Sequence, residues 1–140
     1  MTFGVGQPAV VIDASAIVEI LGGDATWLER WRAWTRAGAM ILAPPHFGAE
    51  VANAMLRGIG LDAHAASNRI RQLFAMGLSS ADRGLSGILG AIELADRYRL
   101  SVYDALYLDL ALDIDAELAT LDRDLAAAAE AEGLAVTGQL

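Results

Sequence analysis

Short, continuously apolar segments recur along this chain, and longer stretches with helical periodicity lie between them. The first such segment, Ala9–Asp13 (AVVID), has four apolar residues in a row before its aspartate, instead of alternating apolar and polar residues. Uninterrupted apolar strands are typical of a sheet that is buried on both faces. Their alternation with helices predicts an α/β fold with a central, mainly parallel sheet between two layers of helices, a three-layer α/β/α sandwich.

The expected elements follow from apolar runs, capping residues and glycines. Asp24 is expected to cap the second helix, and Gly38, Gly58 and Gly133 to end helices. The loop-like segment LSSADRGLSG is expected to hold at most a short strand, at its start. We expect strands at Ala9–Asp13, Met40–Ala43, Glu117–Leu121 and Leu134–Thr137, and helices near Ser15–Leu21, Ala25–Ala37, His46–Arg57, Asp62–Met76, Ile88–Tyr98, Val102–Leu112 and Arg123–Ala131.

Length and composition are those of one globular domain with ample material for a core. The chain has 140 residues, of which 55% are hydrophobic, and its mean hydropathy is +0.39. No apolar run is long enough to cross a bilayer, and the N-terminus lacks the pattern of a signal peptide. Cysteine is absent, which excludes disulfides, thiolate metal sites and a cysteine nucleophile. We therefore expect a soluble cytoplasmic protein.

The net charge of −8 argues against binding nucleic acid by simple phosphate neutralisation. It is compatible with a basic protein partner, or with a cluster of carboxylates that a cation neutralises. All ten basic residues are arginine, so any chemistry that needs a lysine is excluded.

Four acidic residues stand where the predicted topology brings them to one edge of the sheet. Asp13 ends the first strand, and Asp122 comes just after the strand that begins at Glu117. Glu50 lies about one turn into the helix after the second strand. Asp104 lies in the first turn of a helix, where backbone N–H groups favour a carboxylate. Because sites of open parallel sheets lie beyond the carboxyl ends of the strands, these acids have a route to one cleft.

Each acid also has an ordinary structural explanation. Asp13 or Ser15 could cap the first helix and Asp122 the last, Glu50 could be solvated, and Asp104 could be a first-turn charge. All four, however, stand in or beside apolar stretches, where an ionised carboxylate without a partner is costly. The chain has no lysine, and no arginine obviously reaches three of the acids. A divalent cation such as Mg²⁺ or Mn²⁺ is the more economical partner.

Several classes that also place acids at strand ends are excluded by missing residues. A receiver domain and a haloacid-dehalogenase-type phosphatase both need a lysine, and the phosphatase needs an aspartate where Ser15 stands. A P-loop and a dinucleotide-binding turn are absent. A ribonuclease with an acid–base pair of His46 and His64 is disfavoured, because both positions are typical of surface or capping residues.

Four motifs, in order along the chain, resemble those of the PIN-domain family, and more closely its VapC-type toxins from bacterial toxin–antitoxin pairs. The motifs are VIDASAIVEIL, PPHFGAEVANAML, YRLSVYDALYLDLAL and LATLDRDLAAAA. The resemblance covers nearly the whole chain and implies a single PIN-like nuclease domain over residues 1–140. The site residues that it implies are Asp13, Ser15, Glu50, Asn53, Asp104, Thr120 and Asp122.

The resemblance implies a Mg²⁺- or Mn²⁺-dependent endoribonuclease, in which a metal-activated water attacks the scissile phosphorus. Asp13 and Asp104 would be the principal catalytic and metal-binding residues, and Glu50 and Asp122 would complete the site. This chemistry leaves 5′-phosphate and 3′-hydroxyl ends, because the RNA 2′-hydroxyl is not the nucleophile. The residues expected to orient the carboxylates are Ser15, Asn53 and Thr120.

Other charged residues near these motifs have open roles. Asp124 is either a further ligand or a surface residue of the last helix, and we favour the surface. Asp109 is expected to face away from Asp104. The arginines that could contact phosphates, or equally lie on solvated helix faces, are Arg69, Arg71, Arg83, Arg97 and Arg99.

Two surfaces could bind protein partners. Trp27, Trp31 and Trp34 share one helix face, which is expected to pack mostly on the core and in part to line a groove for an antitoxin segment, as the resemblance implies. The resemblance also implies a homodimer through middle helices, near Asn53–Arg57 and Ala65–Met76.

Two other functions remain open. One is a PIN nuclease that acts on structured DNA or in RNA maturation, which the small size and acidity of the chain disfavour. The other is a non-catalytic PIN scaffold that only binds a protein partner, which the four intact acids disfavour.

Overall fold

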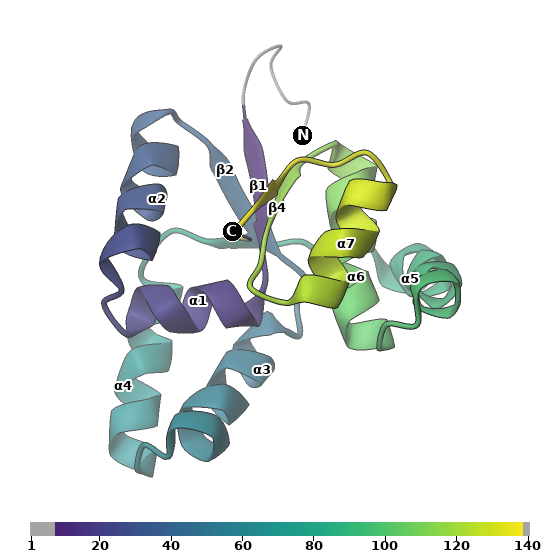
Figure 1. The fold of residues 1–140 in the computed structure, drawn as a ribbon. Coiled ribbons are helices and arrows are strands. Elements are labelled where there is room, and N and C mark those ends of the chain that lie inside the picture. Colours follow the sequence, from purple (N-terminus) through teal and green to yellow (C-terminus); the bar gives the residue numbers. More distant parts are fainter. Residues whose placement is uncertain (1–7, 139–140) are drawn as a thin grey trace.

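A computed structural model of the chain describes residues 8–138, and its elements alternate between strands and helices (Figure 1). Helices α1, α2 and α4 lie on one side of the sheet in this view, and α5, α6 and α7 lie on the other. The elements are β1 (Ala9–Ile12), α1 (Ala14–Leu21), α2 (Ala25–Arg36), β2 (Met40–Ala43), α3 (Phe47–Asn53), the π-helical η1 (Ala54–Ile59), α4 (Ala63–Phe74), β3 (Ser79–Ser80), α5 (Gly84–Tyr98), α6 (Val102–Ile114), β4 (Glu117–Ala119), α7 (Arg123–Ala131) and β5 (Val136–Thr137).

The sheet has the strand order β3-β2-β1-β4-β5, and every pairing among the described strands is parallel. Strand β1 is central: Val11 is in register with Leu42 of β2 on one side and with Leu118 of β4 on the other. This arrangement confirms the predicted α/β sandwich. Since all strands run the same way, their carboxyl ends share one edge, at the bottom of Figure 1.

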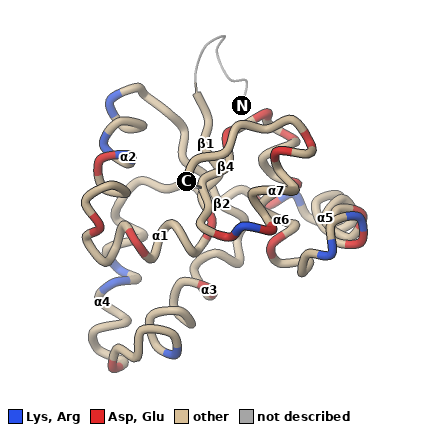
Figure 2. The backbone as a smooth tube through the Cα atoms, in the orientation of Figure 1, with Lys and Arg blue, Asp and Glu red and all other residues tan. Residues whose placement is uncertain are grey.

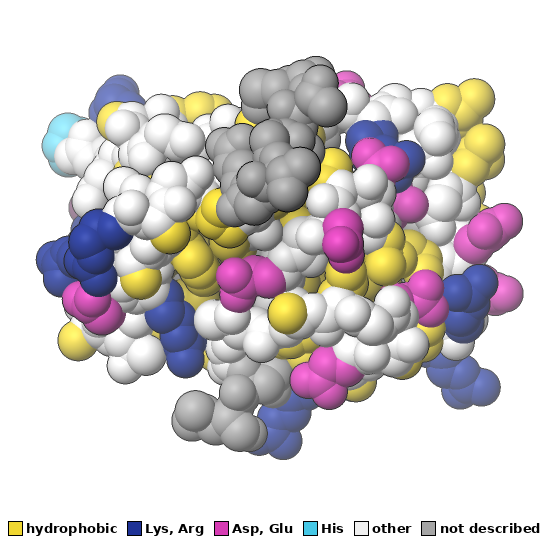
Figure 3. Space-filling model, turned by 90° about the horizontal axis from the view of Figure 1, so that it is seen from above, with side chains coloured by type: hydrophobic (Ala, Val, Ile, Leu, Met, Phe, Trp, Pro, Cys, Tyr) yellow, Lys and Arg dark blue, Asp and Glu magenta, His cyan; other side chains and the backbone are white. Residues whose placement is uncertain are grey.

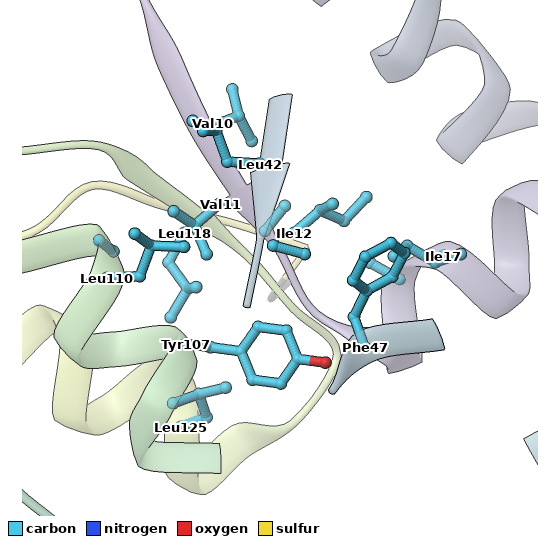
Figure 4. Close-up of a cluster of buried hydrophobic side chains, with 14 of the residues drawn as sticks. Val10, Val11, Ile12, Ile17, Leu42, Phe47, Tyr107, Leu110, Leu118 and Leu125 are labelled. Atoms are coloured by element: carbon cyan, nitrogen blue, oxygen red, sulfur yellow. The ribbon is translucent and has the colours of Figure 1, made fainter. Parts of the chain in front are cut away.

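The core forms on both faces of β1, because helices cover both faces of the sheet. Val10, Val11 and Ile12 are fully buried, as the unbroken apolar run predicts. Figure 4 shows the Tyr107 ring of α6 in this cluster, with its hydroxyl directed toward the side where Phe47 of α3 lies. A polar group thus enters the core from α6 and must find a partner there.

Most element ends lie where capping residues predict them. The side chain of Asp24 accepts a hydrogen bond from the N–H of Trp27, and that of Asp62 from the N–H of Ala65. Gly38 and Gly133 have positive φ just past their helices. The short strand β3 lies at the start of the LSSADRGLSG segment.

Two predicted boundaries are wrong. The helix after β2 does not end at Gly58: it loosens into the π-helical turn η1 and ends at Gly60, which adopts the left-handed conformation at φ 84°. Helix α5 begins at Gly84, four residues before the predicted start at Ile88. At the start of α5 the carboxylate of Asp82 accepts a hydrogen bond from the N–H of Gly84 at 2.8 Å, a local signal that the prediction missed.

The outer surface carries mixed charge. Figure 3 views the face at the amino ends of the strands, where acidic side chains are scattered among apolar ones and arginines lie mostly toward the edges. Among the described helices, none combines the length and the apolar character that spanning a membrane requires.

Candidate active site

The four predicted acids lie on loops and helix starts at the carboxyl edge of the sheet, where Figure 2 shows acidic positions below the strands. Asp13 directly follows β1, and Asp122 lies between β4 and α7. Glu50 is in the first turn of α3, and Asp104 is in the first turn of α6. Residues separated by up to 109 positions in the sequence thus come from four different elements to one edge.

Asp13 is the most deeply buried of these acids, with 5% of its surface exposed. Its Oδ1 accepts hydrogen bonds from the Ser15 hydroxyl at 2.6 Å and from the N–H of Ala16 at 3.1 Å, and its Oδ2 accepts one from the Thr120 hydroxyl. Burial raises the pKa of Asp13 to about 6, against these hydrogen bonds, which lower it. The charge of Asp122 raises it further.

The loops after β1 and β4 are joined by hydrogen bonds around Asp13. The N–H of Leu121 donates to the Ser15 hydroxyl, and the N–H of Asp122 donates to the Thr120 hydroxyl, both at 2.9 Å. The Ser15 hydroxyl therefore contacts both Asp13 and the loop after β4, and the Thr120 hydroxyl contacts Asp13 across the strands and Asp122 in its own loop. These hydrogen bonds hold the Asp13 carboxylate in one orientation, and the role of both residues in a metal site stays a prediction.

Asp13 and Asp122 are also helix caps, so the ordinary explanation and the functional one are compatible for both. Asp13 caps α1 through Ala16. Oδ1 of Asp122 accepts from the N–H groups of Asp124 at 2.9 Å and Leu125 at 3.1 Å, which caps α7. Each cap leaves further lone pairs on the carboxylate available to a ligand.

Glu50 is half-buried and is held by two residues. Its Oε1 accepts a hydrogen bond from the Tyr107 hydroxyl at 2.8 Å, and Nε2 of His46 lies 2.9 Å from the same oxygen. Burial alone would raise the pKa of Glu50, but the hydrogen bonds from His46 and Tyr107 outweigh it and the pKa is lowered. Glu50 therefore differs from Asp13 and Asp104, whose pKa values are raised.

His46 and Tyr107 were not predicted as site residues. His46 starts the helix as expected, but it also contacts Glu50 one turn later, and its Nε2 is 3.1 Å from the backbone carbonyl of Tyr103. Two spacings are the signals that could have identified them: His46 and Glu50 at i, i+4, and Asp104 and Tyr107 at i, i+3.

Asp104 is half-buried, and its N–H donates to the Ser101 hydroxyl that caps α6. Burial raises the pKa of Asp104, and so do the charges of Asp122 and, to a smaller extent, Glu50. The acids therefore lie close enough to repel one another, as expected of a carboxylate cluster without a counter-ion.

Three other predicted residues lie outside this hydrogen-bonded cluster. Asn53, at the end of α3, has an exposed side chain. Asp124 is exposed and contributes only its backbone N–H, to Asp122, in keeping with the surface role favoured for it. Asp109 pairs with Arg83, which precedes α5, and makes no hydrogen bond with the four acids among the described residues.

Four of the five candidate arginines are already paired within the protein. Arg83 contacts Asp109 and Asp113, and Arg97 contacts Glu132. The guanidinium of Arg69 donates to the Leu21 carbonyl, and that of Arg71 donates to Asn68. Arg69, Arg71 and Arg97 remain exposed, in keeping with the solvated helix faces considered from the sequence, whereas the Arg83 side chain is only 26% exposed.

The tryptophan face packs mainly on the core. Trp27 is 4% exposed, and its ring centroid lies 6.5 Å from that of Trp34. Trp31 and Trp34 are half-buried against the core. A role in partner binding stays a prediction for all three and is best suited to Trp31 and Trp34, which keep some exposed surface.

The donor set fits a hard divalent cation. All four acids offer carboxylate oxygens, which Mg²⁺ and Mn²⁺ prefer. Within residues 8–138, no three histidine or acidic side chains converge tightly enough to enclose a metal ion. A closed cage is not required, because Mg²⁺ is usually held by one or two carboxylates and keeps several waters.

Three solved structures share the fold over most of their length. PAE2754 from Pyrobaculum aerophilum is 23% identical, with a TM-score of 0.68, and the match covers 95% of this chain and 92% of that chain. VapC20 from Mycobacterium tuberculosis, described as a sarcin–ricin loop cleaving toxin, is 18% identical, with a TM-score of 0.67 and coverage of 89% of this chain and 95% of that chain. A toxin–antitoxin complex from Klebsiella pneumoniae is 17% identical, with a TM-score of 0.66 and coverage of 84% of this chain and 90% of that chain. At these identities the likeness concerns the fold. Comparison with curated proteins yields no match.

The sequence itself matches a family model. The model of the PIN domain matches residues 10–131, which include all four acids and both residues that hydrogen-bond Asp13 through their hydroxyls. The match covers far more than half of the chain. This chain belongs to the PIN domain family.

Proposed function

We propose that the protein is a metal-dependent endoribonuclease and the toxin of a VapBC-type toxin–antitoxin pair. The observation that carries the proposal is the cluster of Asp13, Glu50, Asp104 and Asp122 at the carboxyl edge of a PIN domain. The likeness to a structure described as a sarcin–ricin loop cleaving toxin supports the toxin role, and the likeness to a toxin–antitoxin complex supports the partner.

In this proposal Asp13 and Asp104 hold Mg²⁺ or Mn²⁺, and Glu50 and Asp122 complete the site directly or through water. Such an ion, when bound, would supply an activated water and offset the charge of the leaving oxygen. The raised pKa values of Asp13 and Asp104 support a site that gains from a cation, because a positive charge favours the ionised form of both.

The surrounding residues have positioning roles. Ser15 and Thr120 fix the Asp13 carboxylate from two directions, so the ligand does not have to be ordered when metal binds. Tyr107 holds Glu50 ionised and aimed from α3 into the cluster, where it is suited to orient a nucleophilic water. Asn53 is proposed to contribute only once RNA or metal is bound, since its side chain is exposed.

The partner surfaces are proposals as well. A basic antitoxin segment would complement both the net charge of −8 and the clustered acids. For a homodimer, the exposed side chains of Leu56, Ile59 and Phe74 on η1 and α4 support the middle-helix surface expected from the sequence.

The decisive experiment is RNA cleavage by wild type, Asp13→Asn and Asp104→Asn with and without Mg²⁺ or Mn²⁺. We expect metal-dependent cleavage by wild type only, with Asp124→Asn as the matched control that retains it, because Asp124 is an exposed acid beside the same site. If wild type and both site variants behave alike in RNA cleavage and in growth arrest, the enzyme proposal fails and a protein-binding scaffold is favoured.

The toxin role is tested separately from the chemistry. Growth arrest by wild type should be relieved by co-expression of a small protein with a basic tail, which we expect the neighbouring reading frame to encode. Cleavage without growth arrest, or arrest that no neighbouring protein relieves, would favour a nuclease of RNA maturation instead.

A further inference from the structure

A cavity of about 210 Å³ lies beside the acid cluster, between the loops that follow β2 and β3 and the helices α5 and α6. We propose that this cavity, here called the side pocket, holds one nucleobase of the substrate, next to the phosphate that is cut. The inference rests on the proposed ribonuclease function. The residues that carry it are His46, Arg83, Ile88, Leu106 and Asp109.

The side pocket is joined to the acid cluster by shared residues. His46 lines the pocket, and its Nε2 lies 2.9 Å from Oε1 of Glu50. Leu106, on the pocket wall, is two residues after Asp104 in α6. A nucleotide whose phosphate reaches the acids would therefore find this pocket within the reach of its own base or of a neighbouring one.

The apolar part of the wall suits the face of a base. The His46 ring is supported by Tyr107 at 5.0 Å and by Tyr103 at 5.8 Å between ring centroids, and Ile88 and Leu106 add aliphatic surface. Unstacked RNA bases are commonly held by such aromatic side chains, including histidine. The volume is below the roughly 300–1,000 Å³ of pockets for drug-sized ligands, which favours a single ring system.

The polar part of the wall suits the edge of a base and not a phosphate. Arg83 and Asp109 form an ion pair there, and their side chains are 26% and 14% exposed. Together they present donors and an acceptor, as the mixed edges of bases require. A phosphate needs donors alone, and the carboxylates of Asp82 and Asp109 in the wall would repel it.

The helix packing keeps this pair in place. Helices α5 and α6 approach closely at Gly87 and Gly90, and a side chain at Gly90 would collide with the carboxylate of Asp109. A side chain at Gly87 would meet Cβ of Arg83 at 2.9 Å. The two glycines therefore create the space in which a charged pair, and not a packed apolar contact, forms part of the pocket.

Binding can be measured without catalysis. We would titrate wild type, Ile88→Trp and Leu89→Trp with adenosine, guanosine, cytidine and uridine in turn, and follow the NMR signals of the His46 ring and the Leu106 methyl groups. Ile88 and Leu89 are similarly exposed neighbours on α5, 47% and 54%, but only Ile88 lines the pocket. Leu89→Trp therefore controls for the addition of an exposed indole to α5 outside the pocket.

We expect at least one nucleoside to shift these signals in wild type and in Leu89→Trp, and to bind at least tenfold more weakly to Ile88→Trp. If Ile88→Trp does not unfold cooperatively, Leu106→Trp replaces it and fills the pocket from α6. The inference is overturned if none of the four nucleosides shifts the wild-type signals, or if the pocket-filling variant binds as wild type does.

Cleavage provides the second test. In a set of RNA substrates with one abasic nucleotide at successive positions around the cut, we expect wild type to lose at least tenfold in kcat/KM at one position, and Ile88→Trp to show no such loss there. If wild type cuts RNA but shows no such loss at any abasic position, the proposal that the side pocket holds a base is wrong. If wild type cuts no RNA, the proposed function is wrong, and the nucleoside titration still tests whether the side pocket binds a base.

Discussion

The hydroxyl of Thr120 donates a hydrogen bond to the carboxylate of Asp13, which lies 107 positions earlier in the chain. Both residues are buried, and both lie at the carboxyl ends of neighbouring central strands, β4 and β1. The bond therefore connects the first element of the fold to one of the last, at the point where the proposed metal site begins. Its contribution can be tested directly.

Thr120→Val should destabilise the protein at pH 7 by about 1–3 kcal/mol, because a buried carboxylate loses a donor and the N–H of Asp122 loses an acceptor. Urea denaturation of the metal-free protein measures the change. Thr120→Ser keeps the hydroxyl and should recover most of the stability and of the RNA cleavage. A valine variant as stable as the serine variant would show that this hydrogen bond contributes little.

The raised pKa of Asp13 predicts how the stability of the metal-free protein depends on pH. The folded state holds a proton on Asp13 up to about pH 6, whereas the unfolded chain releases it near its ordinary value of 3.8. The folded state thus binds more protons between these values, and stability falls as pH rises from about 4 to about 6. The loss is at most about 3 kcal/mol.

This effect can be separated from other titrations by comparing wild type with Asp13→Asn, which cannot titrate. The difference in unfolding free energy between them should move in favour of the asparagine variant as pH rises from 4.5 to 7, measured with urea in the presence of a chelator. A difference that is the same at both pH values would mean that Asp13 is not buried as described.

Much of the fold could be predicted because its signals are local. The unbroken apolar run of β1 predicts a strand that is covered on both faces, and Asp24 and Asp62 mark helix starts through their own neighbouring N–H groups. The end of η1 at Gly60 could not be predicted, because Gly58 and Gly60 offer the same freedom and packing decides between them.

The acids could be predicted as a group, but their partners could not. Topology alone brings Asp13 and Asp122 to one edge, since both follow parallel strands. The contact of Tyr107 with Glu50 depends on how α6 packs against α3, which no pattern in either helix specifies. The side pocket likewise depends on the close approach of α5 and α6 at Gly90. Nothing in the sequence distinguishes Gly90 from any other glycine within a helix, so the pocket could not be predicted.

Tyr107→Phe should shift the pH dependence of RNA cleavage. The hydroxyl stabilises ionised Glu50, so its removal raises the pKa of that carboxyl; at saturating metal, which holds Asp13 and Asp104 ionised, the acidic limb of the profile moves to higher pH. Tyr103→Phe is the control, because Tyr103 contacts His46 through its backbone carbonyl, which the change leaves intact. An unchanged acidic limb in Tyr107→Phe would mean that ionised Glu50 is not needed for cleavage.

Phe74→Glu should weaken self-association if the homodimer forms through the middle helices. Phe74 is 65% exposed, so the change places a charge in the proposed interface; it also removes the ring contact with Phe47, 5.7 Å between centroids, so the folding of the variant is checked by urea denaturation. Leu85→Glu is a matched comparison on α5, where Leu85 is 72% exposed. Light scattering over a range of concentrations should show monomers for Phe74→Glu and dimers for Leu85→Glu. Monomers for Leu85→Glu alone would show that the interface lies on α5.

The chemical nature of the cut ends tests the role of the carboxylates most directly. Asp13, Glu50, Asp104 and Asp122 provide carboxylates for a cation, and water, not the RNA 2′-hydroxyl, is the expected nucleophile. Cleavage should therefore stop in a chelator, return on addition of Mg²⁺ or Mn²⁺, and leave 5′-phosphate and 3′-hydroxyl ends. A substrate with 2′-deoxyribose at the cut position should still be cleaved. Mass spectrometry of the fragments distinguishes the outcomes, because 2′,3′-cyclic phosphate ends would exclude attack by water. Such ends would require a general base that deprotonates the 2′-hydroxyl, and His46, beside Glu50, is the first residue to test for that role.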